Sequence, residues 1–317
     1  MSAKKILKTI DLYAGVGGIR LGFEKAGFET VFANDFEPSC KITYDLNFRT
    51  VPLTIADIGT INPTKLPDFD FLLGGFPCQP FSIAGFRKGF DDSDRGNQFF
   101  NIIRILKTKK PMGFLLENVK NLKGHDKGNT FKVIEEALAS LGYHIKVKVL
   151  NSADYGNIPQ NRERVYIVGF KEKKFIDKFE FPNPVPLTTN LSDIFDKEAP
   201  EKYYYTKSHL FPKLKSEIKN PNTVYQWRRQ YVRENKRGVC PTLTANMGTG
   251  GHNVPLILDT KGIRKLTPAE CFRIQGFPRK YKLPKNLADS KLYKQAGNSV
   301  TVTVIERIAK NIAKAVR

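Results

Sequence analysis

The chain has 317 residues, of which 40% are hydrophobic, enough for one large domain with a smaller one attached. Its 52 Lys and Arg residues outnumber its 31 Asp and Glu residues, and the formal net charge of +21 points toward a polyanion partner such as duplex nucleic acid, with a solvated basic surface as an equally weighted alternative. No apolar run approaches the roughly 20 residues of a membrane span and the start lacks a signal-peptide stretch, so we expect a cytoplasmic protein with no membrane partner.

The four cysteines, Cys40, Cys78, Cys240 and Cys271, lie far apart in the sequence and form no CxxC pair. This spacing suggests neither a disulfide framework nor a zinc site. The four histidines are equally scattered. We therefore expect no metal chemistry.

A nucleotide-binding unit is predicted at the start of the chain. A strand over Lys8–Tyr13 runs into the glycine-rich turn Ala14–Gly18, and a helix follows over Ile19–Ala26. A dinucleotide fingerprint would need a third glycine where Arg20 stands. A ligand that has adenosine but no pyrophosphate, such as S-adenosylmethionine, therefore fits better than NAD, and a plain tight turn is the alternative.

Acidic residues follow the next two predicted strands. A strand over Thr30–Ala33 leads to Asp35, which lies 20 residues after Gly15, a distance typical of an acid that binds ribose hydroxyls. Phe36 could lie against an adenine face or simply belong to the core. A third strand over Leu53–Ala56 leads to Asp57, which could bind the same ligand or cap a turn.

The fourth predicted strand, Asp70–Leu73, leads into Gly74–Ser82, which reads GGFPCQPFS. Two glycines and two prolines exclude helix and central strand here, so Cys78 is held in a loop at the carboxyl end of the strand. Ligands bind at that edge of an open α/β sheet. Cys78 is therefore a candidate nucleophile, and a small buried thiol under a tight turn is the alternative.

A carboxyl group and two guanidinium groups follow further along the same domain. A loop over Ile83–Asn97 precedes a helix over Gln98–Leu106 and a strand over Met112–Leu116, which ends at Glu117. After a helix over Asn129–Leu141 and a strand over Tyr143–Leu150, the segment Pro159–Arg164 opens a strand over Val165–Phe170. On extended backbone Arg162 and Arg164 project to the same side, so both could reach one target.

The pattern changes between Lys171 and about Ile263, where prolines and poor periodicity predict a separate, loop-rich lobe. Its segment Tyr225–Arg233 interleaves aromatic, amide and guanidinium groups that suit base edges and phosphates, with ordinary surface decoration as the alternative. Thr267 is predicted to cap a helix that begins at Pro268. The segment Gln295–Val300 then leads into a closing helix over Val302–Ala315.

Several of these motifs, in this order, resemble those of the DNA (cytosine-5)-methyltransferases, in particular the bacterial type II restriction-modification members. The resemblance rests on Ala14–Gly18, on Pro77-Cys78-Gln79-Pro80-Phe81-Ser82, on Glu117-Asn118-Val119, on Pro159–Arg164 and on Gln295–Val300, and it covers all but roughly residues 171–235. It implies a Rossmann-like, S-adenosylmethionine-dependent α/β domain over 1–180. A smaller target-recognition domain would follow over 181–285, and 286–317 would return to the catalytic domain.

The resemblance also assigns roles to individual residues. Cys78 would add to carbon 6 of cytosine, Glu117 would support ring nitrogen 3, Arg164 would contact the exocyclic oxygen and Arg162 would position the site. The cofactor-binding residues would be Tyr13, Gly15, Gly17, Gly18, Asp35, Phe36, Asp57, Ile58, Pro77, Asn298 and Ser299. The DNA-binding residues would be Ser82, Arg95, Arg228, Arg229, Arg233 and Thr242.

The expected activity is methyl transfer from S-adenosylmethionine to carbon 5 of a flipped-out cytosine within a short duplex DNA sequence, through a covalent cysteine adduct. A monomer acting on DNA in a bacterial cytoplasm is expected, and the resemblance raises a restriction endonuclease for the same site as a partner. Three alternatives remain: a tRNA cytosine-5 methyltransferase, an NAD-dependent oxidoreductase, and a DNA-binding regulator without activity.

Overall fold

The computed structural model describes residues 5–77, 98–249 and 253–317, and the chain divides into two compact units. The first unit comprises Met1–Leu150, Glu163–Asn183 and Val304–Arg317, and the second comprises Asn151–Arg162 and Pro184–Thr303. These units differ from the expected division because residues 151–162 and 286–303 lie in the second unit. The functional domains 1–180, 181–285 and 286–317 stay predictions.

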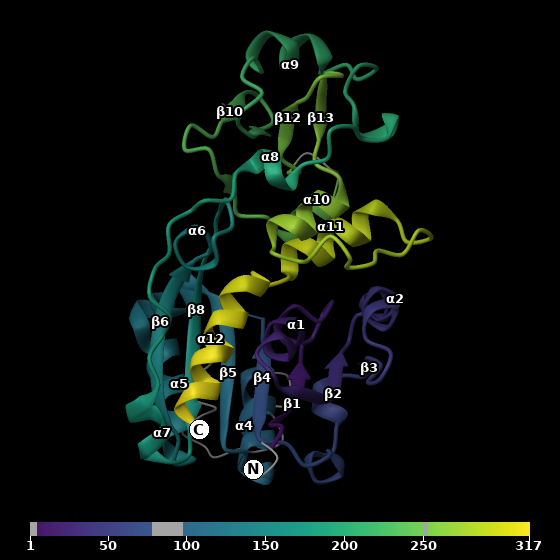
Figure 1. Ribbon diagram of the computed structural model, residues 1–317. Coiled ribbons are helices and arrows are strands. Elements are labelled where there is room, and N and C mark those ends of the chain that lie inside the picture. The colour runs from purple at the N-terminus through teal and green to yellow at the C-terminus, as the bar shows by residue number, and fades with distance from the viewer. Residues whose placement is uncertain (1–4, 78–97, 250–252) are drawn as a thin grey trace. The chain divides into compact units, whose positions relative to one another are not determined.

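A seven-stranded sheet forms the centre of the first unit (Figure 1). Its strands are β1 (Lys8–Leu12), β2 (Glu29–Asp35), β3 (Thr54–Ile55), β4 (Phe71–Gly75), β5 (Gly113–Val119), β6 (His144–Asn151) and β8 (Glu163–Phe170), in the order β3-β2-β1-β4-β5-β8-β6. The pairs from β3 to β5 are parallel, whereas β8 is antiparallel to β5. The predicted Rossmann-like class is confirmed, and the antiparallel β8 adds a detail that the sequence pattern did not predict.

Helices cover both faces of this sheet. The helices of the first unit are α1 (Gly18–Lys25), α2 (Pro38–Asn47), α4 (Gln98–Lys109), α5 (Asn129–Ser140), α7 (Lys173–Lys178) and α12 (Val302–Ala315), of which α12 joins this unit from Val304. An added side chain at Gly74 would meet Ile102 of α4, whereas one at Gly75 would meet Ile19 of α1. Since successive strand residues point to opposite faces, α4 and α1 lie on opposite sides of the sheet.

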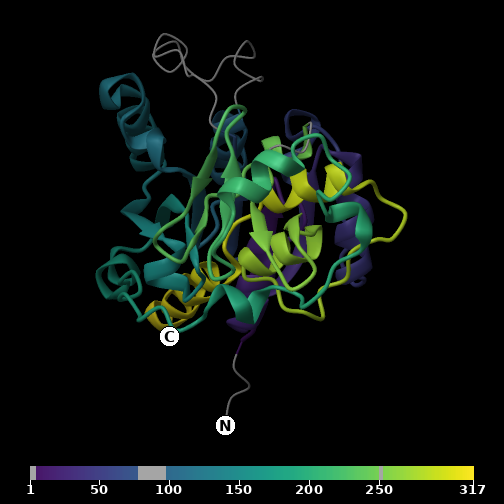
Figure 2. The same cartoon turned by 90° about the horizontal axis from the view of Figure 1, so that it is seen from above.

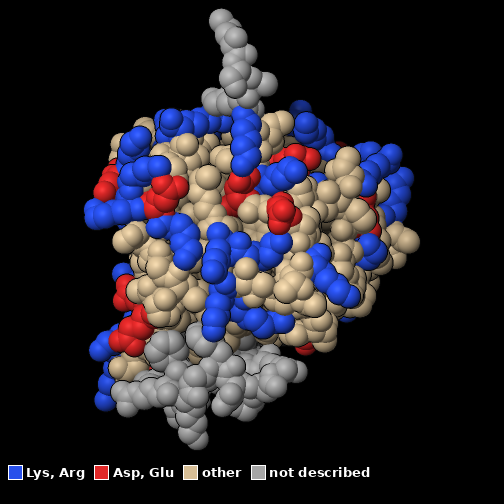
Figure 3. Space-filling model, turned by 90° about the horizontal axis from the view of Figure 1, so that it is seen from below, with Lys and Arg blue, Asp and Glu red and all other residues tan. Residues whose placement is uncertain are grey.

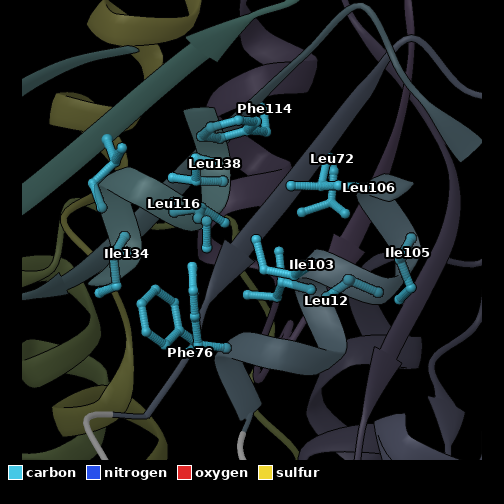
Figure 4. Packing of buried hydrophobic residues seen from close by; sticks show 14 of the residues in the cluster. Leu12, Leu72, Phe76, Ile103, Ile105, Leu106, Phe114, Leu116, Ile134 and Leu138 are labelled. Carbon is cyan, nitrogen blue, oxygen red and sulfur yellow. The ribbon is translucent and has the colours of Figure 1, made fainter. Parts of the chain in front are cut away.

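The main hydrophobic core lies between the sheet and the helices α4 and α5. Figure 4 shows Leu72 and Leu116 of the sheet packed with Ile103 of α4 and Leu138 of α5. On the other face, α12 packs tightly against α1, because a Cβ added to Gly22 would lie 2.6 Å from Cγ2 of Ile305. The near-continuous apolar runs of β4 and β5 fit strands that are buried on both faces.

The strand order reverses at β1, which pairs with β2 on one side and β4 on the other. Such a switch point opens a crevice outside the carboxyl ends of the strands, where ligands bind in open α/β sheets. The glycine-rich turn follows β1 at this edge, and Phe76 and Pro77 follow β4. The fold therefore brings the predicted cofactor turn and the start of the predicted catalytic loop to one edge of the sheet.

The second unit is built from short elements, which run from teal through green to yellow in Figure 2. They are α6 (Ser152–Gly156), β7 (Gln160–Asn161), α8 (Leu191–Ile194), α9 (Phe211–Glu217), β9 (Tyr225–Trp227), β10 (Val232–Glu234), β11 (Cys240–Pro241), β12 (Leu256–Leu258), β13 (Ile263–Lys265), α10 (Pro268–Ile274) and α11 (Asp289–Asn298). The strands β10-β9-β12-β13 form an antiparallel sheet over a small core, and β11 pairs with β7 in parallel. The predicted cap of α10 is present, because Thr267 and Glu270 form a capping box.

Basic side chains are not gathered into a single patch on the face in Figure 3, where Lys and Arg are spread among fewer Asp and Glu residues. The charge of this face therefore does not mark a site by itself. None of the helices in the described ranges is long and apolar enough to cross a membrane. Cys40, Cys240 and Cys271 are buried free thiols.

Candidate active site

The glycine-rich turn after β1 has two glycines in the left-handed region, Gly15 with φ 53° and Gly17 with φ 76°. A Cβ at Gly17 would lie 2.3 Å from the ring of Phe48, so both the backbone angle and the close packing require glycine there. A Cβ at Gly15 would meet nothing within 4 Å. The turn is therefore packed against the protein at Gly17 and faces open space at Gly15, and Gly18 begins α1.

Asp35 fixes the position of this turn from the end of β2. Its Oδ2 accepts a hydrogen bond of 2.8 Å from the backbone N–H of Gly15, and its Oδ1 accepts one of 2.9 Å from that of Glu37. Burial raises the pKa of Asp35, and the backbone N–H donors partly offset that rise. A carboxylate that holds the turn also has lone pairs left for a ligand hydroxyl.

Phe36, directly after β2, is 72% exposed and so does not belong to the core, which was the alternative for this residue. An exposed aromatic ring beside the turn is suited to stack on a planar ligand. Asp57 caps the short 3₁₀ helix η1 (Ile58–Thr60), because its Oδ1 accepts from the N–H of Gly59 at 2.7 Å. The cap alternative for Asp57 is thus confirmed, and the side chain of Ile58 is buried.

Asn34 organises the same edge, a role that sequence reasoning missed. Its amide Nδ2 donates to the carbonyl oxygens of Thr54 at 3.1 Å and Ala56 at 3.0 Å. These bonds tie the end of β2 to the segment that leads to Asp57. The position of Asn34 at the end of a strand, next to an acid, is the signal that could have found it.

Tyr13, whose φ is 55°, is held by a 2.8 Å hydrogen bond from its hydroxyl to the carbonyl of Gln98.

Arg20, at the position of the missing third glycine, is buried. Its guanidinium donates at 2.9 Å to the hydroxyl of Tyr44 and the carbonyl of Val51, and it lies 4.3 Å from the ring centroid of Phe48.

Nearby, Asp11 in β1 is fully buried, and neither of its carboxyl oxygens has a hydrogen-bond partner among the described residues. Burial raises the pKa of Asp11 to about 7, although the positive charge of Arg20 lowers it.

A buried carboxylate and a guanidinium meet at the carboxyl end of β5. Nε of Arg164 lies 3.1 Å from Oε1 of Glu117, which is 8% exposed. The antiparallel register explains the contact, because Arg164 in β8 stands opposite Val119, two residues after Glu117. On its other side Glu117 pairs with Gly75, the last residue of β4. The carboxyl group therefore stands where the chain leaves β4 toward Cys78.

Asn118 anchors that departing chain and is a second residue that sequence reasoning did not assign. Its buried Nδ2 donates at 2.9 Å to the carbonyl of Phe76, two residues before Cys78, and its Oδ1 accepts from the N–H of Val119 at 2.8 Å. Pro77 is exposed. Cys78 itself, together with Ser82 and Arg95, lies outside the described residues.

The alternation of an extended chain predicted that Arg162 and Arg164 could reach one target. In the structure their side chains contact different residues. The chain is not one continuous strand there, since Arg162 stands between β7 and β8 and is counted in neither. Its guanidinium donates to the carbonyl oxygens of Leu243 at 2.8 Å and Ser299 at 2.6 Å within the second unit. Its positioning role stays a prediction.

The remaining predicted site residues lie in the second unit. Arg228, Arg233 and Thr242 line a groove of about 620 Å³, whose other lining residues include Gln226 and Asn161. Four cationic side chains and one acidic side chain surround it, so its electrostatics favour an anion. Arg229, with φ 62°, lies at the tip of the β9–β10 hairpin. Asn298, the last residue of α11, is exposed, and Ser299 is buried.

Comparison with known proteins agrees with this geometry. The family described as C-5 cytosine-specific DNA methylase matches residues 7–314. The chain is 56% identical over 314 residues to the type II methyltransferase M.Bsp6I of Bacillus sp. strain RFL6, covering 98% of this chain and 99% of that protein. It is 45% identical over 309 residues to the type II methyltransferase M.HaeII of Haemophilus aegyptius, covering 96% and 92%.

Among solved structures, a mutant of DNMT2 from Spodoptera frugiperda has the same fold, with a TM-score of 0.75, 22% identity and coverage of 97% of this chain and 99% of that one. The family match spans the glycine-rich turn, Glu117, Arg164 and Asn298 alike. This chain belongs to the family of C-5 cytosine-specific DNA methylases.

Proposed function

We propose that this protein transfers a methyl group from S-adenosylmethionine to carbon 5 of a cytosine within a specific short sequence of duplex DNA, through a covalent adduct to Cys78. The observation that carries the proposal is the buried contact of 3.1 Å between Glu117 and Arg164. Glu117 lies on the strand next to β4, and Cys78 follows β4 in the sequence. Family membership supports the same reaction.

The first step requires access to the face of the ring. A stacked cytosine hides both faces, so the target nucleotide swings out of the duplex, which costs a few kcal/mol for unstacking. The thiolate of Cys78 then forms a bond to carbon 6, and negative charge develops in the ring. The carboxyl group of Glu117, hydrogen-bonded to ring nitrogen 3, neutralises that charge. Arg164 orients Glu117 and reaches the exocyclic oxygen, while Arg162 positions the site.

The residues at the switch point fit S-adenosylmethionine. The open space beside Gly15 leaves room for a ligand against the turn, and the exposed ring of Phe36 offers a face for adenine. Asp35 precedes Phe36 in the chain and accepts a hydrogen bond from Gly15. The residues that would hold the cofactor are Tyr13, Gly15, Gly17, Gly18, Asp35, Phe36, Asp57, Ile58, Pro77, Asn298 and Ser299. Bound there, the cofactor supplies the methyl group. Burial of Arg20 in the core, where a third glycine would stand, speaks against a pyrophosphate-binding oxidoreductase.

The reaction ends by restoring the thiolate. Once carbon 5 has gained the methyl group, a base removes the proton from that carbon. The electron pair of the broken C–H bond re-forms the double bond between carbons 5 and 6. The bond between carbon 6 and the sulfur of Cys78 then breaks, so that the enzyme is unchanged and the product is 5-methylcytosine.

Recognition of the DNA is assigned to the groove in the second unit and to residues 82 and 95 of the segment that follows β4 in the sequence. The cationic side chains of Arg228 and Arg233 and the hydroxyl of Thr242 line the groove. Arg229 at the hairpin tip, with Ser82 and Arg95 in that segment, would contact the phosphate backbone. We propose a monomer that acts on DNA in a bacterial cytoplasm, paired with a restriction endonuclease of the same specificity.

The test compares the wild-type protein with Cys78→Ala on duplex DNA, with Cys40→Ala as a control that changes another thiol. Cys78→Ala should lose methyl transfer but still bind DNA, and DNA containing 5-fluorocytosine should trap a covalent adduct only with proteins that keep Cys78. Bisulfite sequencing of plasmid from expressing cells would map the methylated site. Turnover by Cys78→Ala would refute the proposal, and methylation of tRNA but not duplex DNA would favour the tRNA alternative.

A further inference from the structure

Arg162 occupies a buried position in the second unit that its motif did not predict. The residue is 2% exposed, and its guanidinium spans two segments that are distant in the sequence. Nη1 donates to the carbonyl of Leu243 at 2.8 Å, and Nη2 donates to the carbonyls of Ser299 at 2.6 Å and Gly297 at 3.3 Å. Burying a charged group costs free energy unless hydrogen bonds compensate, so these carbonyls define where the side chain must lie.

The same neighbourhood ties the Leu243 segment to the chain around Arg162. The backbone N–H of Leu243 donates to Oε1 of Gln160 at 3.1 Å, and the hydroxyl of Thr242 donates to the carbonyl of Asn161 at 2.6 Å. The strand β11 pairs with β7 immediately before these contacts. Residues 240–243 are therefore held along residues 160–162 by both backbone and side-chain bonds.

The end of α11 is packed against the next residues of that segment. A Cβ added to Gly297 would lie 2.1 Å from the carbonyl carbon of Thr244 and 2.5 Å from the backbone nitrogen of Ala245. Only glycine allows the two backbones to approach this closely. With Arg162 bonded to both sides, residues 243–245 and residues 297–299 form one closely packed, hydrogen-bonded junction.

This junction connects two proposed binding functions. Pro241 and Thr242 form part of the wall of the basic groove, together with Asn161. Asn298 and Ser299, on the other side of the junction, are the residues assigned to the cofactor. A shift of the groove wall would therefore be passed through Leu243, Arg162 and Ser299 to the backbone of Asn298.

We propose that Arg162 is a positioning residue that couples the DNA-recognition groove to the cofactor-binding residues Asn298 and Ser299, rather than a group that contacts the base. This inference rests on the proposed function, since it takes the roles of the groove and of Asn298 from it. Ordering of residues 297–299 by the cofactor then orders residues 241–245 as well. The second ligand finds its site already formed, which is positive coupling between the two.

The test follows backbone hydrogen exchange in peptides covering 240–249 and 296–302, with and without S-adenosylhomocysteine, the product of the methyl donor. In the wild-type protein the ligand should slow exchange in both peptides, by roughly tenfold, a typical size of coupling between sites. In Arg162→Met, which keeps the side-chain volume but has no donors, protection should be confined to 296–302. Arg162→Lys should restore part of the effect.

Arg273→Met is the matched control, because it also removes a mostly buried guanidinium from the second unit, one that donates to the carbonyl of Ile194 and pairs with Asp196. This control should keep the protection of both peptides. Thermal unfolding of each variant is measured as well, so that only proteins that are folded under the exchange conditions are compared. Steady-state kinetics give an independent readout: Arg162→Met should raise the KM for S-adenosylmethionine and for DNA together by about tenfold, with a smaller loss in kcat.

Protection of both peptides in Arg162→Met would overturn the coupling role. So would a 240–249 peptide that the ligand protects in none of the proteins. A loss in kcat alone, with both KM values unchanged, would also overturn it, because that pattern belongs to a group acting on the reacting atoms. Failure of the wild-type protein to bind S-adenosylhomocysteine or to methylate DNA would instead count against the proposed function. The two failures are therefore distinguishable.

Discussion

Oε1 of Glu117 lies 3.1 Å from Nε of Arg164, with both side chains almost wholly screened from solvent. The guanidinium lies beside the carboxyl group at the edge of the sheet where β4 ends. We expect Glu117→Gln to lower kcat by about 10²- to 10⁴-fold, the range typical of a lost general acid or base, because the amide cannot neutralise the ring charge. Single-turnover methyl transfer on duplex DNA would measure the loss.

Glu163→Gln is the control for this prediction, because Glu163 stands in the same strand β8 but is half-exposed and paired with Lys120. Surface ion pairs contribute only about 0–1 kcal/mol, so this variant should keep wild-type kinetics and nearly wild-type stability. Equal rates for Glu117→Gln and Glu163→Gln would contradict the role assigned to Glu117.

Asn118 should control how well the chain just after β4 is placed, because it binds the backbone of Phe76. Asn118→Ala removes a buried 2.9 Å hydrogen bond to the carbonyl of Phe76 and leaves that carbonyl without this donor. We expect a loss of about 1–3 kcal/mol in the free energy of unfolding. We also expect slower adduct formation with 5-fluorocytosine DNA, because the backbone two residues before Cys78 loses its anchor. Urea unfolding and adduct rates measure the two effects, and an unchanged adduct rate would show that the anchor does not reach Cys78.

The two glycines of the turn should respond differently to alanine. Gly17→Ala places a methyl group 2.3 Å from Phe48 in a left-handed conformation, so it should unfold at markedly lower urea concentration than the wild-type protein. Gly15→Ala meets no neighbour and should cost only the left-handed backbone penalty of about 1–2 kcal/mol. Its methyl group would enter the proposed cofactor space, however, and should weaken S-adenosylmethionine binding measured by calorimetry. Tight binding by a folded Gly15→Ala variant would place the cofactor elsewhere.

Phe36 should matter for binding and not for folding. Because its side chain is 72% exposed, Phe36→Ala should change the free energy of unfolding little. The loss of a stacking face should weaken S-adenosylmethionine binding by about 1–3 kcal/mol, the range measured for bases on aromatic side chains. Ile42→Ala, another exposed apolar residue on the nearby helix α2, should leave the affinity unchanged. Equal affinities for both variants would remove Phe36 from the site.

The elements around the switch point could be predicted from the sequence because their signals are local. The apolar run of β4 and the glycines after β1 each fix a strand or a turn within a few residues. The capping box at Thr267 and Glu270 is equally local, and it is present at α10. The antiparallel direction of β8 could not be predicted, because strand direction depends on the path between strands and not on the pattern within one.

The contacts of Arg162 show where sequence reasoning reaches its limit. Its three carbonyl partners lie 81, 135 and 137 residues away in the chain. Backbone carbonyls also carry no residue-specific signal, so no motif could have indicated them. Asn118 was missed for a related reason, since its partner is the backbone of Phe76, 42 residues earlier. The pairing of Glu117 with Arg164 likewise depends on the antiparallel register of β5 and β8, which the sequence pattern did not predict.

Asp11 makes stability depend on pH. Its pKa rises from 3.8 to about 7 because of burial, so between these values the folded protein binds a proton that the unfolded chain does not. Stability is therefore lost as pH rises through this window, by up to about 4 kcal/mol for this group alone. Asp11→Asn cannot ionise, so its free energy of unfolding relative to the wild-type protein should increase from pH 5 to about pH 7 and then level off. Urea titrations at several pH values measure this difference, in which other titrating groups cancel. Parallel curves for the two proteins would mean that Asp11 keeps an ordinary pKa in the folded state, and its burial beneath the turn would then need a partner for the charge.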